Sequence, residues 1–293
     1  MPDLLLRATA ANGAIRAVAA LTTDLVNDAM TRHRTSYTAS AALGRALTGG
    51  VLMASALLKE IGVLNISING RGPLGPIHVD AWAGGTVRGY LGNPGVEIRL
   101  TDEGRLDVGA GVGVEGIMSI THDTGRGHPY TGTVELVSGE LGDDFTHYLA
   151  TSMQTRSAVS LGFMLDKEGK ASVAGGFLVQ LMPSAVDELA ERIEGTLQSL
   201  PSFSRLYREA GNLEGVLQAA LQGFSVELLP TDEVPNFSCP CSMERVLRAI
   251  ATLGAAEIQD MMAQEEATEV HCKYCNTRYE VSHAQLGQLL DLG

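Results

Sequence analysis

The chain of 293 residues is 45% hydrophobic and 19% charged, an ordinary globular composition that excludes wholesale disorder. Its 34 acidic and 21 basic side chains give a formal net charge of -13 and a sequence pI near 4.9. This balance argues against a nucleic-acid-coating role, because binding to the phosphate backbone depends on clustered Lys and Arg. The four cysteines all lie in the last fifth of the chain: Cys239, Cys241, Cys272 and Cys275.

The N-terminus gives no sign of a targeting segment. It begins Met1-Pro2-Asp3-Leu4, with an acid where a signal peptide carries basic residues. The most apolar stretch, between Arg45 and Lys59, is shorter than the roughly 20 apolar residues that span a bilayer. We therefore expect a cytoplasmic protein without membrane contact, whose thiols are kept reduced.

The mixture of strand-like and helix-like segments over residues 1–183 predicts an α+β domain in which a mainly antiparallel sheet packs against helices. Asn12-Gly13 is a tight-turn dipeptide between two strand-like segments, and a long helix rich in Ala and Leu is expected over about 36–59. Glycine-rich turns separate the other expected strands: 64–70, 77–82, 86–91, 117–122, 131–137, 158–165 and 172–181. A short helix is expected near 143–151. Because strands and helices do not alternate regularly, a doubly wound sheet is disfavoured.

From residue 184 to about 229 the pattern is helical. Apolar residues recur at spacings of three and four in two stripes: Val186, Leu189, Ile193, Leu197 and Leu200, then Leu213, Val216, Leu217 and Leu221. A turn-rich stretch with Pro230 and Pro235 follows. We therefore place a helical linker at 184–236 and a small C-terminal domain at 237–293. The stripes either pack in the ordinary way on the first domain or form a detachable cover over an apolar surface.

The cysteines form two close pairs, Cys239-Pro-Cys241 and Cys272-Lys-Tyr-Cys275, separated by thirty residues. Zinc favours four ligands, with sulfur at about 2.3 Å, and an all-cysteine set is a closed, structural site. Four free core thiols or two structural disulfides are the alternatives. Confinement to two pairs and a reducing compartment favour one zinc ion on the four thiolates. His271 and His283 lie nearby but are not needed to complete the ligand set.

The expected zinc site should contribute much of the folding stability of so small a domain. A module of about 55 residues has a marginal core, whereas structural zinc contributes roughly 10–16 kcal/mol of apparent binding free energy. That is comparable to the whole stability of a domain, about 5–15 kcal/mol. Oxidants convert thiolates to disulfides, which bind zinc poorly. The module is therefore physically capable of acting as a redox switch.

The cysteine segments, Phe237-Ser-Cys-Pro-Cys-Ser-Met-Glu-Arg245 and Val270-His-Cys-Lys-Tyr-Cys275, resemble those of the redox-regulated chaperones of bacteria, the thirty-three-kilodalton heat-shock proteins. The stretches Ala174-Gly-Gly-Phe-Leu-Val-Gln-Leu-Met-Pro183 and Ile66-Ser-Ile-Asn-Gly-Arg-Gly-Pro-Leu-Gly75 also resemble parts of that family. The similarity runs over the whole chain in the same order, without departure at the four cysteines.

This resemblance implies a holdase chaperone that works without ATP and is not an enzyme. Reduced and zinc-bound, such a protein is folded and inactive. Peroxide or hypochlorous acid, helped by heat, oxidises the cysteines and releases zinc; the implied disulfides are Cys239–Cys241 and Cys272–Cys275. The C-terminal domain and then the linker unfold, and the exposed apolar surface binds unfolding client proteins. Activated subunits of the family dimerise.

Nucleotide binding and active-site chemistry find little support in the sequence. Gly70-Arg-Gly-Pro-Leu-Gly75 matches G-x-G-x-x-G, but Pro73 and Pro76 lead into a strand instead of a helix. The sequence has neither a G-x-x-x-x-G-K-[ST] loop nor a G-x-S-x-G elbow. The histidines of the first domain lack metal spacing and are expected to be structural or at the surface: His78, His122, His128 and His147.

A zinc-ribbon protein that binds nucleic acid or the translation machinery is the alternative from another class. Lys273, Tyr274 and Arg278 are its candidate contacts. The region 239–293 carries four basic against eight acidic residues, which disfavours it. A thiol oxidoreductase is a further alternative, but its cysteine pair would stand at a helix start after a strand, and that context is absent.

Overall fold

The computed structural model describes residues 2–59, 61–183, 185–264 and 267–291. The chain divides into two compact units, Met1–Phe237 and Ser238–Gly293, which are described separately below. The expected start of the linker at Ser184 and the last residue, Gly293, lie outside the described residues.

The first layer of the larger unit is an antiparallel sheet of five strands in the order β10-β1-β2-β9-β8. Its strands are β1 (Leu4–Ala10), β2 (Ile15–Leu21), β8 (Ser157–Leu165), β9 (Ala171–Leu181) and β10 (Val226–Leu229). The predicted hairpin is confirmed: Ala10 lies opposite Ile15, and Asn12 and Gly13 between them have φ angles of 55° and 82°. Positive φ at both positions is what the Asn-Gly dipeptide tolerates.

The second layer is a sheet of six strands in the order β11-β5-β4-β3-β6-β7. Its strands are β3 (Val63–Asn69), β4 (Ile77–Trp82), β5 (Thr86–Leu91), β6 (Ile117–Asp123), β7 (Tyr130–Glu135) and β11 (Asn236–Phe237). All neighbours are antiparallel except β11, which pairs parallel with β5. Two sheets with packed helices confirm the predicted α+β class and its mainly antiparallel pairing.

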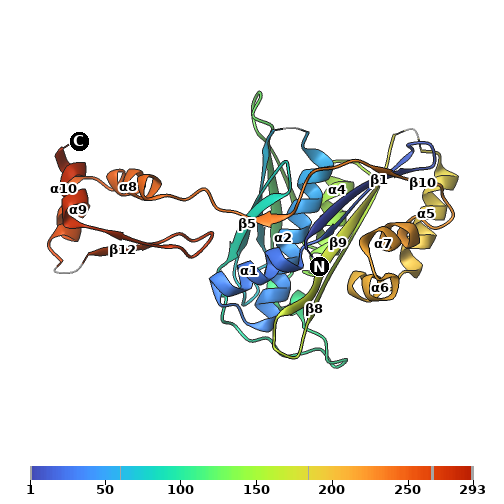
Figure 1. The fold of residues 1–293 in the computed structure, drawn as a ribbon, viewed down its shortest axis with the longest axis horizontal. Coiled ribbons are helices and arrows are strands. Elements are labelled where there is room, and N and C mark those ends of the chain that lie inside the picture. Colours follow the sequence, from blue (N-terminus) through green and yellow to red (C-terminus); the bar gives the residue numbers. More distant parts are fainter. Residues whose placement is uncertain (1, 60, 184, 265–266, 292–293) are drawn as a thin grey trace. The chain divides into compact units, whose positions relative to one another are not determined.

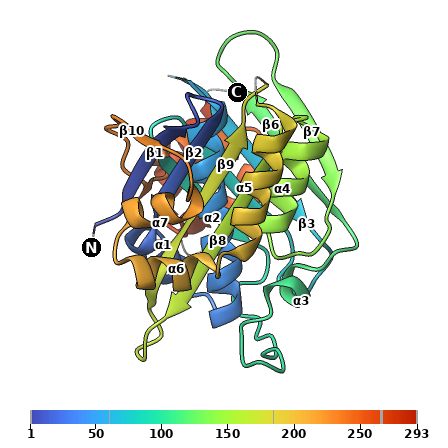
Figure 2. The same cartoon turned by 90° about the vertical axis from the view of Figure 1, so that its right-hand side faces the viewer.

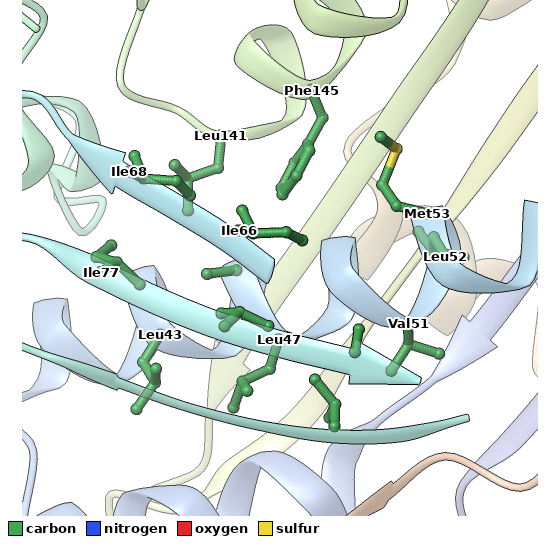
Figure 3. Packing of buried hydrophobic residues seen from close by; sticks show 14 of the residues in the cluster. Leu43, Leu47, Val51, Leu52, Met53, Ile66, Ile68, Ile77, Leu141 and Phe145 are labelled. Atoms are coloured by element: carbon green, nitrogen blue, oxygen red, sulfur yellow. The ribbon is translucent and has the colours of Figure 1, made fainter. Parts of the chain in front are cut away.

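Helix α2 (Tyr37–Leu57) lies between the two sheets and forms the centre of the core (Figure 1). The Ser36 hydroxyl caps it by accepting the N–H of Ala39 at 3.3 Å. Figure 3 shows Leu43 and Leu47 of this helix packed with apolar residues of the six-stranded sheet. The long predicted helix is therefore confirmed, and its burial explains its composition.

By length and composition α2 could cross a membrane, and it is the single such helix in the described part of the chain. Our expectation that this region is too short was wrong, because the helix has 21 residues and begins well before Arg45. However, 78% of its most apolar window is buried inside the protein. Core helices of soluble proteins show the same combination.

Three further helices complete this part of the unit: α1 (Thr23–His33), α3 (Val108–Val112) and α4 (Gly142–Thr151). Helix α4 was predicted, whereas α3 was not. Two glycines of the G-x-G-x-x-G stretch, Gly70 and Gly72, lie against α3 and its end: a Cβ on Gly70 would come within 2.1 Å of the Gly113 carbonyl oxygen. The third, Gly75, lies against the backbone of Gly92. The stretch connects β3 to β4 without opening a helix, so its glycines serve close backbone packing and not a dinucleotide.

The linker region folds as α5 (Asp187–Ser199), α6 (Phe203–Ala210) and α7 (Leu213–Ala220), which cover the outer face of the five-stranded sheet (Figure 2). Both predicted stripes face that sheet, except that Val186 precedes α5 and is 66% exposed. The prediction of helix up to residue 229 was wrong at its end. Residues Val226–Leu229 form β10, because the edge of β1 offers them a full row of backbone partners.

The described residues of the smaller unit form a two-stranded hairpin and three helices: β12 (Thr268–His271), β13 (Arg278–Val281), α8 (Met243–Ala251), α9 (Ala255–Met262) and α10 (His283–Asp291). Ser242 caps α8, and Ser282 with Gln285 forms a capping box at the start of α10. Helix α9 was not predicted; Gly254, at a φ of 91°, separates it from α8. The apolar core is small, with four fully buried members among the described residues: Ile250, Ile258, Val281 and Leu286.

Candidate metal centre

The smaller unit brings all four cysteines together. Cys239 and Cys241 come from the extended segment before α8, and Cys272 and Cys275 from the turn between β12 and β13. The four Sγ atoms lie within 4.8 Å of one another. Two close contacts cross between the pairs, with Cys239 Sγ lying 3.7 Å from Cys272 Sγ and Cys241 Sγ lying 3.3 Å from Cys275 Sγ. It is the one group of potential metal ligands found within the described ranges.

The turn that carries the second pair is fixed by its backbone. The Asn276 N–H donates to the Cys272 carbonyl at 2.7 Å, and the Cys272 N–H donates to the Thr277 carbonyl at 3.0 Å. Asn276 takes a φ of 56°, which asparagine tolerates better than most residues. The chain thus reverses tightly between β12 and β13, which places Cys272 and Cys275 in one turn.

The geometry fits a tetrahedral ion bound by four sulfurs. Zinc–sulfur bonds of about 2.3 Å place the sulfurs of a tetrahedron about 3.8 Å apart. The observed separations of 3.3 and 3.7 Å, and the 4.8 Å limit for the whole set, require shifts of no more than about 1 Å. Cys275 is buried and the other three are half-buried, as in a closed site. The nearby His271 instead contacts Glu269 through its Nε2 atom, outside the cluster.

Two hydroxyl groups contact the sulfurs. The Tyr279 hydroxyl donates to Cys241 Sγ at 3.0 Å, and the Thr277 hydroxyl lies 3.1 Å from Cys275 Sγ. One sulfur of each pair therefore has a hydroxyl partner. Neither residue was predicted from the sequence to contact the cysteines. The sequence feature that could have identified Thr277 and Tyr279 is their spacing of two residues. In the extended chain that follows the Cys272–Cys275 turn, this spacing places both side chains on the same side.

The protonation of the cluster depends on where each sulfur lies. Burial raises the pKa of Cys272 to about 12 and raises that of Cys241. Burial also opposes ionisation of Cys275, but hydrogen bonds from Thr277 and the neighbouring thiols lower its pKa to about 7. The hydrogen bond to Cys241 raises the pKa of Tyr279 to about 12. Four adjacent thiolates repel one another, so a bound cation would favour the fully ionised set.

The basic residues of this unit are partly neutralised by local acids. Arg278 contacts Glu269 at 2.7 Å and Glu280 at 2.6 Å. These exposed pairs contribute little stability, but they place two carboxylates beside the strongest candidate for a phosphate contact. The arrangement weakens the zinc-ribbon alternative.

Fold and site together define a class of protein: an α+β unit whose sheet is covered by amphipathic helices, followed by a small unit held around four thiols. Residues 3–282 of this chain match the family model described as Hsp33 protein. The 33 kDa chaperonins of Gloeothece citriformis (strain PCC 7424) and Synechocystis sp. (strain ATCC 27184 / PCC 6803 / Kazusa) are each 45% identical over 99% of this chain, covering 98% and 96% of their own lengths. The chain belongs to the Hsp33 family, as the resemblance predicted.

A solved structure supports the same assignment. The crystal structure of the 33 kDa chaperonin (Heat shock protein 33 homolog) from Thermotoga maritima matches with a TM-score of 0.90 at 35% identity. The match covers 98% of this chain and 97% of that one. All three relatives are named as 33 kDa chaperonins.

Proposed function

We propose that this protein is a redox-regulated holdase chaperone that works without ATP. The observation that carries the proposal is the convergence of Cys239, Cys241, Cys272 and Cys275 in a unit with a very small apolar core. A fold with so little buried surface depends on its thiols for stability. Family membership adds the chaperone role.

In the reduced state the four sulfurs would hold one Zn²⁺ ion, which, when bound, stabilises the fold of the smaller unit. The all-thiol donor set favours zinc over hard cations such as calcium or magnesium. The proposed parts are an N-terminal domain (1–183), a linker (184–236) and a switch domain (237–293). With the linker helices in place, the protein is in its resting form.

Oxidation would remove the thiolates on which the fold depends. Peroxide oxidises one thiol of a pair to a sulfenic acid with release of water, and the second thiol displaces a second water to form the disulfide. We assign the disulfides to neighbours, Cys239 with Cys241 and Cys272 with Cys275. A disulfide sulfur is a poor zinc ligand, so the ion leaves and the switch domain unfolds.

Unfolding would then spread to the linker and uncover an apolar face. The helices α5, α6 and α7 cover buried residues of the five-stranded sheet, among them Ile15, Phe177 and Val179. This face suits the binding of unfolding client proteins, because exposed apolar surface associates with other apolar surface. We further propose that activated subunits dimerise and that the protein acts in the cytoplasm, without nucleotide or nucleic acid.

The test measures zinc content, free thiols and the aggregation of an unfolding client, before and after treatment with peroxide at elevated temperature. We expect one zinc ion per reduced chain, its release on oxidation, and suppression of aggregation by the oxidised form alone. A double Cys239→Ser/Cys241→Ser variant provides the control without the first disulfide. If zinc is released but aggregation is unchanged, the chaperone function is refuted. Salt-dependent binding of nucleic acid by the reduced protein would instead favour the zinc-ribbon alternative.

A further inference from the structure

Strand β10 occupies the edge of the five-stranded sheet. It pairs antiparallel with β1, in a register that places Val226 opposite Ala10 and Leu229 opposite Arg7. On its other side β1 pairs with β2. Without β10, the sheet would therefore end in β1, with a row of unpaired N–H and C=O groups.

All four residues of β10 pair with β1 through the backbone, whereas their side chains are mostly exposed to solvent. Glu227 is exposed, Leu228 and Leu229 are 41% and 36% exposed, and Val226 alone is half-buried. The neighbouring strand β1 has buried side chains instead, since Ala8 and Ala10 are fully buried beneath the linker helices. A strand held mainly by main-chain hydrogen bonds makes few demands on side-chain identity. The edge of β1 can therefore pair with strands of many different sequences.

The segment after β10 holds it in place. Glu233 lies 2.7 Å from the Arg7 guanidinium, which also donates to the Ser55 hydroxyl at 2.9 Å. A few residues later, β11 adds to the edge of the six-stranded sheet by pairing with β5. One continuous stretch, residues 226–237, thus covers an edge of both sheets.

We propose that the edge of β1 is a strand-addition site for an extended segment of an unfolding client, and that β10 occupies this site in the resting protein. The inference rests on the proposed function, because oxidation must first release the linker. The chemistry of the edge indicates what binds there. The edge of β1 pairs with an extended chain through backbone hydrogen bonds, and an unfolded protein has unpaired backbone N–H and C=O groups whatever its sequence. The apolar face beside the edge adds affinity for apolar side chains.

The probe is a fluorescent peptide with the sequence of residues 224–231, added to the oxidised and to the reduced full-length chain. Two N-methylated forms are matched controls, one modified at residues 227 and 229 and the other at 226 and 228. In an antiparallel pair, alternate residues direct their N–H groups to the partner strand, so just one of these forms loses its bonds to β1. We expect binding to the oxidised chain only, with one methylated form weaker by about tenfold or more and the other nearly unchanged.

Hydrogen exchange of the backbone amides separates the two hypotheses. If residues 226–229 stay protected after oxidation, the linker has not been released, and the proposed function fails together with this inference. If they exchange freely while both methylated peptides bind equally, or no peptide binds, the strand-addition site alone is refuted. Protection of the β1 amides that grows with protein concentration in the absence of peptide would overturn it in favour of a second copy's β10. Peptide-dependent protection of Arg7 and Thr9 would support it.

Discussion

The Tyr279 hydroxyl donates a hydrogen bond to Cys241 Sγ at 3.0 Å, so a residue of β13 contacts the first cysteine pair directly. Thr277 plays the same part for Cys275, at 3.1 Å. When a bound cation already holds the sulfurs as thiolates, a hydrogen bond does not increase the ionised fraction; it withdraws electron density from sulfur and reduces its reactivity toward peroxide. Two side chains outside the ligand set are thus placed to influence how readily the thiols are oxidised.

In the zinc-loaded chain, where all four sulfurs are thiolates, removing these hydroxyls should make the sulfurs easier to oxidise. A net hydrogen bond of about 1 kcal/mol corresponds to about fivefold in rate, so we expect roughly that increase for Tyr279→Phe and for Thr277→Val. The measurement is the loss of free thiols and the release of zinc under a fixed peroxide concentration. Thr277→Ser keeps the hydroxyl and serves as the control, with a rate close to that of the parent chain. Equal rates in all four proteins would show that the hydroxyls do not protect the sulfurs.

Removal of the metal should unfold the smaller unit and leave the larger one folded. The larger unit has an extensive core of its own, whereas the smaller has four fully buried apolar side chains besides Cys275 among its described residues. Calorimetry of the zinc-loaded chain should show a transition that disappears with a strong chelator or in Cys275→Ser, while the main transition persists. Retention of both transitions after verified removal of zinc would contradict this prediction.

Phe203 anchors α6 on the five-stranded sheet, and its loss should loosen the linker without oxidation. Its ring is fully buried and lies against Gly162 and Gly175, where an added Cβ would come within 3.0 Å of it. Truncation of a buried Phe costs about 3–5 kcal/mol. We expect Phe203→Ala to bind a hydrophobic dye in the reduced state.

Phe224→Ala is the matched control for that experiment. Its ring is only partly buried and stacks against Arg192, with 4.7 Å between the guanidinium carbon and the ring centroid. It should therefore cause a smaller change in dye binding. If Phe203→Ala binds no more dye than Phe224→Ala, the linker does not depend on this anchor.

Loss of the Arg7–Glu233 ion pair should weaken the attachment of residues 226–237. The two side chains are 30% and 17% exposed, so the pair is partly desolvated and Glu233→Gln should cost about 1–2 kcal/mol of local stability. Hydrogen exchange of the amides of β10 measures this directly and should become about tenfold faster. Glu209→Gln removes an exposed pair with Arg205 and should leave the exchange of β10 unchanged. Equal exchange in the two variants would contradict the prediction.

The sequence predicted those elements whose signals are local. The Asn12-Gly13 turn, the long apolar helix and the two cysteine pairs each depend on residues close together in the chain, and the structure has all of them. Strand β10 was missed because its state is decided by a partner more than 200 residues away, while its own residues also fit a helical period. Tyr279 was missed for a related reason: a Tyr in a strand has many possible neighbours, and only the fold brings Cys241 to it.

Asp3 should give the larger unit a distinct dependence on pH. Its carboxylate accepts the N–H groups of Asp24 and Leu25 at 2.9 and 2.8 Å, yet burial outweighs these bonds and raises its pKa from 3.8 to about 6. The folded state therefore holds this proton more tightly than the unfolded chain does. Its contribution to stability is present at low pH, falls as the pH rises from about 4 to 6, and is constant above that range.

Asp3→Asn isolates this contribution, because the amide does not titrate. The free energy of unfolding of the parent chain and of the variant should be measured by denaturant titration at several values between pH 4 and 7. Other carboxyl groups contribute equally to both proteins, so the difference between the two curves reports Asp3. We expect the stability of the parent to fall relative to that of Asp3→Asn as the pH rises through this range. A constant difference would mean that Asp3 is already ionised at pH 4, and that its bonds to the start of α1 outweigh its burial.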